Sequence, residues 1–549
     1  MPTDADIATM DLRPFIDAGR EEVRAIMARN QTLGTAAVLV RGDEVVWSEC
    51  FGVTDAASNR PIDPHTLFSL QSTSKNVTAA AVMMAVQRGL LDLDRPITDY
   101  LPDFTVNSRH EQDPQRRMTL RLLLSHRAGF THEAPVGGNF RPDSRSFEAH
   151  VDSISRTWLR YPVGARYAYS NLGIDLAGLV LAKAFGAPFD ETLKALIFDP
   201  LGMGDTTATP EVYVARENRA IGHAPDYDRV PVVVPMQAAG GVYSSAADMA
   251  RYAAFHLGKG RLGGQTLLEP RLWEAMHAFP ETGYQYGLGV MRLPLDLEHA
   301  GIDLLAHNGG GFGFGSSFFY CPDQGLAWVL LYNGQSRGAP SNPYDEIILH
   351  PILKHAHGPV RPPRPPAAQP VAPTPEALDR LAGTYVTGIS FMTLRREGDG
   401  LVLTASDDPA PNRLVFTGPD TAWMAEGPGA PKGLRFHPGR GLEAPWLEFD
   451  NGVGFDYNDG ERDAPGPIGR QYHHDLGDYI VNQWGRAIYP ASLYKKNGWL
   501  YLSGLRVTEH QPGLLFTGDG EALDLRGEAP EFRNIPLERT PPIQSESAP

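Results

Sequence analysis

Ser72 and Lys75 are the residues whose types and spacing point most directly to chemistry. They form a Ser-x-x-Lys element at the start of a segment, Ser72 to Arg88, that is rich in alanine, methionine and valine. Because residues three apart on a helix share a face, the Lys75 amine can reach the Ser72 hydroxyl. The N-terminus of such a helix also offers unpaired backbone N–H groups where an oxyanion would form. The pattern therefore predicts a serine nucleophile with a lysine partner.

The same spacing occurs again in Ser492-Leu493-Tyr494-Lys495. That copy lies in a segment of alternating polar and apolar residues, which predicts a strand. Positions three apart in a strand face opposite sides of the sheet. We interpret this second match as accidental.

Tyr169-Ser170-Asn171 is the one Tyr-x-Asn tripeptide in the sequence, and it precedes an apolar helical pattern from about Leu172 to Phe185. A tyrosine on this loop that faces Lys75 could hold a lowered phenol pKa and pass protons. The alternative is a helix-capping loop with an ordinary buried phenol. For the tripeptide alone, the capping interpretation is favoured.

His307-Asn308-Gly309-Gly310-Gly311 stands just before a predicted strand, Ser316–Tyr320. Other His-x-Gly triplets start at His256, His299 and His437, but only His307 is followed by a glycine run. Glycines without a Cβ let a substrate backbone lie against a strand edge. The run does not fit G-x-G-x-x-G, so it does not predict a dinucleotide-binding loop.

Together and in this order, the three elements resemble those of the serine β-lactamase and penicillin-binding-protein superfamily. Its members carry Ser-x-x-Lys, Tyr-x-Asn and Lys- or His-x-Gly. Segments 89–100, 123–130 and 240–248 are also similar to this family, and the resemblance covers about residues 12–355. It implies a β-lactamase-like α/β (α+β) domain with an antiparallel sheet and a helical subdomain.

The resemblance also implies roles for the matching residues. Ser72 would attack the carbonyl, and Lys75 and Tyr169 would share its proton. Asn171 would hydrogen-bond either Lys75 or the substrate amide. His126, which is tempting as a base, is structural in this family.

His307 takes the strand position that is lysine in penicillin-binding enzymes. Backbone N–H groups of Ser72 and Gly310 would form the oxyanion hole, with Gly309 beside them in the substrate-binding edge. Since lysine helps to hold the carboxylate of penicillins and D-Ala-D-Ala peptides, its replacement argues against cell-wall transpeptidation and strong β-lactamase activity.

The substrate class follows from the same resemblance. His-x-Gly is found in D-aminopeptidases, D-amino-acid amidases and esterases, the D-aminopeptidase-like and CubicO-type serine hydrolases. We therefore expect a serine peptidase or amidase for small peptides or amides with D- or non-ribosomal residues, a class that includes enzymes degrading linearised microcystin. The second hypothesis is a carboxylesterase of the same superfamily, and the third is a catalytically inactive binding protein with this fold.

A proline-dense stretch, residues 359–375, divides the chain. It cannot continue a helix or a central strand, so it predicts a stiff extended linker. Residues 1–358 then form the hydrolase domain, with a helix at about 12–29. We expect its strands at 36–41, 44–51, 315–320 and 326–332 around a mostly helical middle.

The region after the linker contains an internal repeat. Gly383-Thr384-Tyr385 matches Gly477-Asp478-Tyr479, and Leu414–Gly418 matches Leu514–Gly518. Short alternating strands predict two barrel-like repeats, residues 376–465 and 466–549, with a single barrel as the alternative. These repeats resemble the tandem barrels of D-aminopeptidases and the lipocalin-like tails of related peptidases. They either serve solubility or dimerisation, or place a loop over the Ser72 cleft.

Composition limits the partners. The apolar share of 42% and the charged share of 21% are those of globular proteins, and the net charge of −16 argues against nucleic acid or an anionic membrane surface. We expect a small peptide, amide or ester as the partner, with a homodimer left open. The start carries no secretory signal and there are two cysteines, Cys50 and Cys321, so we expect a cytoplasmic protein; a processed precursor would look the same.

No metal or cofactor is expected. The best ligand candidates are His355 with His357, and His473 with His474 beside Asp475. Neither group has a further ligand at metal-site spacing, so solvated histidines are the favoured interpretation. The sequence also lacks Gly-x-Ser-x-Gly, which argues against the α/β-hydrolase design.

Overall fold

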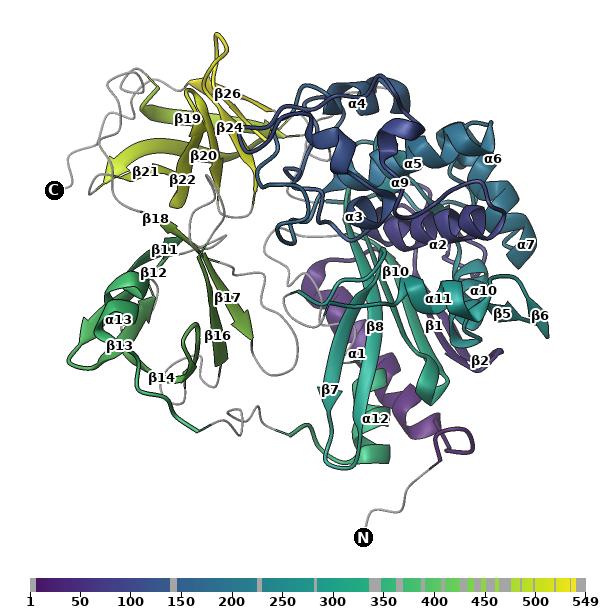
Figure 1. The fold of residues 1–549 in the computed structure, drawn as a ribbon. Helices are drawn as coiled ribbons and strands as arrows, with labels where there is room; N and C mark the ends of the chain where they lie inside the picture. The colour runs from purple at the N-terminus through teal and green to yellow at the C-terminus, as the bar shows by residue number, and fades with distance from the viewer. Residues whose placement is uncertain are drawn as a thin grey trace, which may run out of the picture.

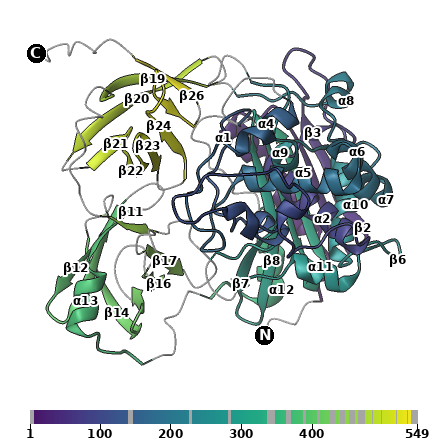
Figure 2. The ribbon, with the colours of Figure 1, turned by 45° about the horizontal axis from the view of Figure 1, so that its top comes forward.

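The computed structural model describes most of the chain. The described residues are 6–138, 146–224, 230–280, 284–334, 347–361, 369–386, 391–405, 410–424, 432–438, 446–450, 460–463, 475–483, 486–496, 499–517, 520–533 and 535–539. Figures 1 and 2 show a mixed sheet-and-helix domain accompanied by two all-β domains.

The first domain is built on an antiparallel sheet of six strands. In spatial order they are β2 (Glu44–Gly52), β1 (Gly34–Arg41), β10 (Leu326–Asn333), β9 (Phe314–Cys321), β8 (Gly301–Gly311) and β7 (Met291–Asp296). Because β1 pairs with β10, the two ends of the domain meet in the middle of the sheet. All four strands predicted from alternation and turn residues are present.

Alternating residues of the sheet enter two hydrophobic cores. On β1, Val38 packs into a core with helices α2 (Ser74–Gln87) and α10 (Ala246–Leu257). Its neighbour Leu39 packs into a second core with α1 (Arg13–Asn30) and α12 (Leu349–His357). Both faces of the sheet are therefore covered by helices, as Figure 1 shows. This explains why the strand reads as a continuous apolar run.

The helical region lies between β2 and β7 in the chain. Its α2 is buried from Ser74 to Ala85, as a helix that is apolar around its circumference requires. It packs against α5 (Asn171–Phe185) and α9 (Gln237–Gly240). The other elements are β3 (Phe68–Ser69), α3 (Leu120–Leu124), α4 (Phe147–Ile154), α6 (Phe189–Leu193), η4 (Lys194–Phe198), α7 (Asp199–Leu201), α8 (Pro210–Ala215), β4 (Tyr243–Ser244), β5 (Arg261–Leu262), β6 (Gln265–Thr266) and α11 (Pro270–Met276).

Within the described ranges, no single helix is long and apolar enough to cross a membrane. One bent pair, Asn171–Phe185 with Phe189–Leu201, meets the length and composition test with an angle of 77° between its parts.

The C-terminal region forms two closed barrels, so the single-barrel alternative is wrong. The first consists of β11 (Gly383–Val386), β12 (Phe391–Glu397), β13 (Gly400–Ala405), β14 (Asn412–Gly418), β15 (Thr421–Met424), β16 (Lys432–His437), β17 (Trp446–Asp450) and β18 (Gly460–Asp463). The second consists of β19 (Gly477–Gln483), β20 (Arg486–Lys496), β21 (Trp499–Leu502), β22 (Leu505–Gln511), β23 (Leu514–Thr517), β24 (Ala522–Asp524), β25 (Glu531–Phe532) and β26 (Ile535–Arg539).

The repeated Gly-x-Tyr element opens the first strand of each barrel. Tyr385 and Tyr479 are both buried, and each hydroxyl donates to a backbone carbonyl four residues earlier, those of Leu381 and Asp475. The second repeat match is wrong, because Phe416 lies on the fourth strand and Phe516 on the fifth. The fourth and fifth strands of the two barrels each start 93 residues apart (412 to 505 and 421 to 514), whereas the Phe match needed 100 (416 to 516).

The linker contains the start of one helix. Pro375 is the first residue of α13 (Pro375–Leu381), where proline is favoured, and the Thr374 hydroxyl caps it by accepting the Ala377 N–H at 3.2 Å. Residues 362–368 of the predicted linker lie outside the described ranges.

Candidate active site

Ser72 and Lys75 lie together, as their spacing predicts. Ser72 belongs to a 3₁₀ turn, η1 (Gln71–Thr73), that leads directly into α2, and Lys75 lies in the first turn of that helix. Lys75 is fully buried, and its Nζ lies 2.9 Å from Ser72 Oγ and 2.9 Å from the carbonyl oxygen of Ala239. A serine hydroxyl and a lysine amine are therefore in hydrogen-bonding contact.

Burial changes the acid–base behaviour of Lys75. Loss of hydration disfavours the ammonium form and lowers the pKa of Lys75 to about 7, although the negative charges of Asp175 and Glu133 act in the opposite direction. A large fraction of the amine is consequently neutral at neutral pH. Lys75 can then accept the Ser72 proton, which an ordinary lysine cannot do.

We expect kcat/KM to rise with pH through about 7 and to level off above it. The reason is that the neutral amine of Lys75 is the active form and its pKa is lowered to about 7. A pH–rate profile of kcat/KM from about pH 5.5 to 9 tests this. A profile that is flat, or that falls with pH in this range, would contradict the assignment of Lys75 as the base.

Tyr169 lies beside this pair, but its ionisation differs from the expectation. Its ring centroid is 5.0 Å from Lys75 Nζ, and its hydroxyl is hydrogen-bonded with Ser72. Burial raises the pKa of Tyr169 instead of lowering it, and the bond to Ser72 offsets this only in part. The phenol therefore keeps its proton in the free enzyme, and the lowered pKa was wrong. Of the two groups, the Lys75 amine is the one whose pKa suits proton acceptance, and the protonated phenol of Tyr169 suits proton donation.

The loop that carries Tyr169 also caps a helix. The Ser170 hydroxyl accepts the Gly173 N–H at 3.4 Å and begins α5. The imidazole of His126 is neutral because burial lowers its pKa well below the ordinary value, and its Nδ1 accepts the Ser170 N–H at 3.1 Å. His126 thus holds the loop in place, which fits the structural role that the resemblance implied.

The side-chain amide of Asn171 makes one hydrogen bond within the described part of the protein. Its Nδ2 donates to Glu133 Oε1 at 2.7 Å. Its Oδ1 is buried and accepts no hydrogen bond from the described residues. The hydrogen bonds described for Lys75 go to Ser72 and Ala239, so the geometry favours the substrate amide over Lys75 as the partner of Asn171.

His307 lies on β8 as a buried, neutral imidazole. Its Nδ1 donates to the carbonyl of Asn308 at 2.8 Å, and its Nε2 is 2.8 Å from the Tyr286 hydroxyl. Burial and the nearby Lys75 lower the pKa of His307 to about 3. His307 therefore presents no positive charge to a substrate carboxylate, unlike the lysine of penicillin-binding enzymes.

The glycine run after His307 lies on a free strand edge. β7 pairs with β8 only from Gly301 to Ala306, and no strand in the described part of the chain pairs with residues 307–311 on that side. A Cβ at Gly309 would lie 2.8 Å from Ser72 N and 2.1 Å from Leu70 O, so only glycine fits there. Gly310 is exposed, with open space where a side chain would be. The edge can accept a substrate backbone beside the nucleophile.

Sequence reasoning missed several residues around this site. The Asp175 carboxylate accepts the Ala239 N–H at 2.9 Å and bonds His150 Nε2 at 2.8 Å, and both side chains are fully buried. Asp175 thus anchors the residue, Ala239, whose carbonyl binds Lys75. One signal was available, because Asp175 is the single charged residue of an otherwise apolar stretch, residues 172–182. Glu133, His132 and Tyr286 carried no comparable signal.

Where the structure describes the rival candidates, their side chains are engaged in other contacts or exposed. Ser492 lies on β20, where its hydroxyl donates to Asp478 Oδ1 at 2.6 Å, and Lys495 is exposed. On α12, His355 packs against Phe15 and His357 bonds Gln324 Oε1 at 2.7 Å. His473 and His474 lie outside the described residues. In the part of the chain that is described, no three His, Cys, Asp or Glu side chains gather as metal ligands.

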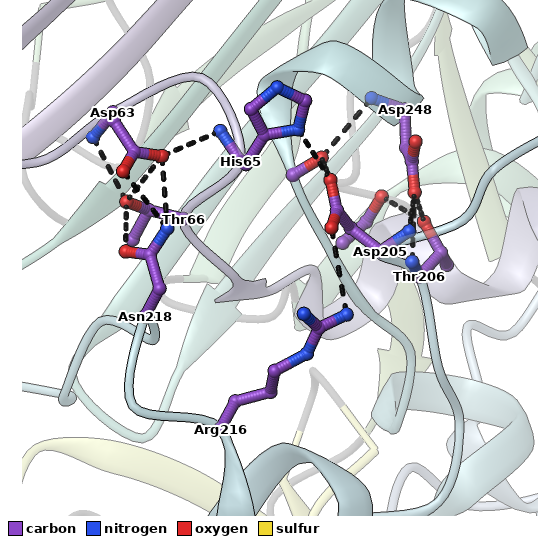
Figure 3. A network of polar contacts seen from close by, with 10 residues as sticks. Asp63, His65, Thr66, Asp205, Thr206, Arg216, Asn218 and Asp248 are labelled. Carbon is purple, nitrogen blue, oxygen red and sulfur yellow. Dashed lines mark hydrogen bonds and ion pairs between the residues drawn. The ribbon is translucent and has the colours of Figure 1, made fainter.

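A second polar cluster contains serine, histidine and aspartate but not in a nucleophilic arrangement (Figure 3). The Ser245 hydroxyl and His65 Nδ1 both bond the same oxygen of Asp205, at 3.3 and 2.8 Å. Activation of a serine would instead require its hydroxyl to hydrogen-bond the imidazole directly. Ser245 caps α10, and Asp248 accepts the N–H groups of Asp205 and Thr206 at 2.8 Å each. The cluster is therefore structural.

Comparisons with known proteins agree with this geometry. Residues 20–350 match the family model described as Beta-lactamase. Esterase EstB of Burkholderia gladioli is 27% identical over 379 residues, which cover 61% of this chain and 94% of that protein. Penicillin-binding protein 4 of Amycolatopsis lactamdurans is 26% identical over 390 residues, which cover 67% of this chain and 96% of that protein.

Among solved structures, that of SurE with D-Leu is similar with a TM-score of 0.55. The match covers 82% of this chain and all of that chain (100%), at 23% sequence identity. At this identity the likeness supports the fold alone. It extends beyond residue 350 and so includes part of the C-terminal region as well as the sheet-and-helix domain.

Proposed function

Since the chain belongs to the Beta-lactamase family and is a serine hydrolase of the β-lactamase and penicillin-binding-protein superfamily, we propose that it is a peptidase or amidase. Its substrates are small peptides or amides that contain D- or other non-ribosomal residues. Ser72 forms the acyl-enzyme, with Lys75 as the base and Tyr169 as the proton donor to the leaving group.

The free edge of β8 is the observation that carries this proposal. A peptide can add to an exposed strand edge through its own backbone N–H and C=O groups. The glycine run places that edge directly against Ser72 N. An ester with a small acyl group has no such backbone to pair with the strand, so the edge favours peptides and peptide-like amides.

Two further observations bear on the substrate, one on the scissile bond and one on its terminal charge. The buried Oδ1 of Asn171 is a hydrogen-bond acceptor, and an amide substrate offers the N–H that an ester lacks. The neutral imidazole of His307 removes the cation that would hold the carboxylate of a D-Ala-D-Ala peptide. A substrate with an amide at its end, or with its carboxylate farther from the scissile bond, fits this site better.

The first step follows from these contacts. Neutral Lys75 takes the Ser72 proton while Ser72 Oγ attacks the carbonyl carbon, and the oxyanion is held by backbone N–H groups at Ser72 and Gly310. Tyr169 delivers a proton to the leaving nitrogen and is reprotonated from Lys75. Water then attacks the acyl carbon while Lys75 takes its proton. The bond between Ser72 Oγ and the acyl carbon breaks, Lys75 returns the proton to Ser72 Oγ, and the acid is released. General-base assistance and the oxyanion hole each contribute on the order of 10²–10⁴ in rate.

A carboxylesterase is the second candidate, because the relative EstB is an esterase by name. The other relative is named for binding penicillin, whose β-lactam ring is a cyclic amide. The same serine, lysine and tyrosine can cleave either bond. The two candidates differ in what the strand edge and Asn171 recognise.

A matched substrate series tests the proposal. We expect hydrolysis of D-aminoacyl amides, D-aminoacyl p-nitroanilides and short peptides, with higher kcat/KM for the D than for the L series. The p-nitrophenyl esters of the same acyl groups provide the comparison, and the Ser72→Ala protein shows the background. Turnover of esters without any turnover of amides would replace this proposal by the esterase.

A further inference from the structure

The second barrel reaches the surroundings of Tyr169 through the turn between β23 and β24. This turn is held by Thr517, whose Oγ1 accepts the Glu521 N–H at 3.0 Å and whose carbonyl accepts the Gly520 N–H at 3.0 Å. The Gly520 carbonyl accepts the N–H of His132 at 3.4 Å, and Glu521 Oε1 lies 2.8 Å from His132 Nδ1. In Figures 1 and 2 the second barrel lies beside the loops of the helical region.

Glu521 is a buried carboxylate that needs a positive partner. Its side chain is 4% exposed, and Arg533 Nε lies 3.4 Å from the same oxygen that contacts His132. Burial opposes the charge on Glu521, yet the attraction of His132 and Arg533 prevails and lowers its pKa. Burial likewise opposes the charge on His132, but Glu521 outweighs it and the pKa of His132 is raised. The contact therefore joins two domains through a buried carboxylate and a partly exposed imidazole (23% exposed), and its electrostatics favour the charged form of each.

His132 connects this ion pair to the Tyr-x-Asn element. Its ring centroid is 5.6 Å from that of Tyr169, and its carbonyl accepts the backbone N–H of Asn171 at 3.0 Å. Its Nε2 is 3.9 Å from Glu133 Oε1, the atom that accepts the Asn171 side chain. A displacement of His132 would thus shift both Tyr169 and Asn171.

We propose that Glu521 of the second barrel is a positioning residue for the active site, an inference that rests on the function proposed for Ser72. It holds His132 as an imidazolium between the barrel and the Tyr169 loop. The barrel is then part of the catalytic machinery instead of a passive attachment. Arg109 provides a second contact between the same domains, since its guanidinium donates to the His510 carbonyl at 2.6 Å.

The contact has an electrostatic consequence for Lys75. The charged or titratable groups around His132 include Glu521 from the barrel turn, Glu133 beside it in the chain, Lys75 from α2, His126 from the loop after α3 and the phenol of Tyr169. Facing Glu521 are His132, Arg533 and Arg160. The imidazolium repels a proton on Lys75, whereas Glu133 attracts one. If His132 becomes neutral, the pKa of Lys75 rises.

Glu521→Gln in the full-length protein tests this positioning role. We expect kcat to fall by up to about 10²-fold, because small displacements of a catalytic group have effects of that size. The acid limb of the kcat/KM profile should move to higher pH, since His132 loses its charge. Asp524→Asn is the matched control, because Asp524 lies in the same barrel and pairs with its own neighbour Arg526. It should behave as wild type.

A second variant tests the same contact from the hydrolase side. His132→Gln should resemble Glu521→Gln, and the double variant should be little worse than the poorer single one, since both remove the same pair. Unchanged kcat and pH profile in Glu521→Gln, a loss of kcat without a shift of the acid limb, or additive losses in the double variant would each overturn the inference. The proposed function is judged separately, by fluorophosphonate labelling of the wild-type protein.

Discussion

Ser72→Ala is expected to abolish turnover and to eliminate labelling by a fluorophosphonate. Ser72 Oγ is the hydroxyl in contact with the buried amine of Lys75, whose pKa is lowered to about 7. Removal of a nucleophile from a comparable site lowers kcat by about 10⁴-fold or more. The measurement is the rate on the best substrate of the matched series, together with gel detection of the fluorescent label.

The control for this variant is provided by the chain itself. Ser492→Ala removes the serine of the second Ser-x-x-Lys match, whose hydroxyl donates to Asp478 in the second barrel. Turnover and labelling should both remain as in wild type. Persistent labelling of the Ser72→Ala protein, or its loss in Ser492→Ala, would show that the nucleophile has been misassigned.

The sheet and the first helices were predictable because their signals are local. The strands around Val38 and Val329 are short apolar runs bounded by turns, and α2 begins at a serine-rich start and continues as an apolar stretch. The order of strands in the sheet was not predictable in this way. The pairing of β1 with β10 joins residues almost 300 positions apart (Val38 to Val329), and no local sequence pattern indicates it.

Within the site, spacing predicted contacts but not ionisation. Ser72 and Lys75 are three residues apart, so one turn of helix brings them together. The direction of the Tyr169 pKa shift was wrong, because it depends on how far the fold removes the phenol from water. Asp175 and Glu133 act on Lys75 across the fold, and only the three-dimensional arrangement brings them near it.

The barrels show the limit of sequence matching inside a repeat. The Gly-x-Tyr match was informative because the tyrosine makes the same structural contact in both barrels. In each, its hydroxyl donates to the backbone carbonyl four residues earlier. Leu-x-Phe-Thr-Gly is an ordinary strand ending in a turn, and such a pattern fits several strands of a barrel equally well. The contact of Glu521 with His132 could not be foreseen, since it depends on how two domains pack.

Lys75→Ala and Tyr169→Phe are expected to lower the acylation rate by on the order of 10²–10⁴ each. Lys75 supplies the base in the proposed mechanism. The Tyr169 hydroxyl is bonded to Ser72, and the Tyr169 ring centroid lies 5.0 Å from Lys75 Nζ. Single-turnover acylation measured by stopped flow gives the rate, and circular dichroism shows that each variant is folded.

The double variant of Lys75 and Tyr169 distinguishes a shared role from separate ones. If both residues move the same proton, removal of either one disables the transfer, so the double variant should be little slower than the poorer single variant. Asp248→Asn is a suitable control, because Asp248 is another buried polar residue but bonds Thr206 in the separate cluster of Figure 3. Losses that add fully in log rate would mean that Lys75 and Tyr169 act in different steps, and the proton relay from Ser72 through Lys75 and Tyr169 to the leaving group would have to be replaced.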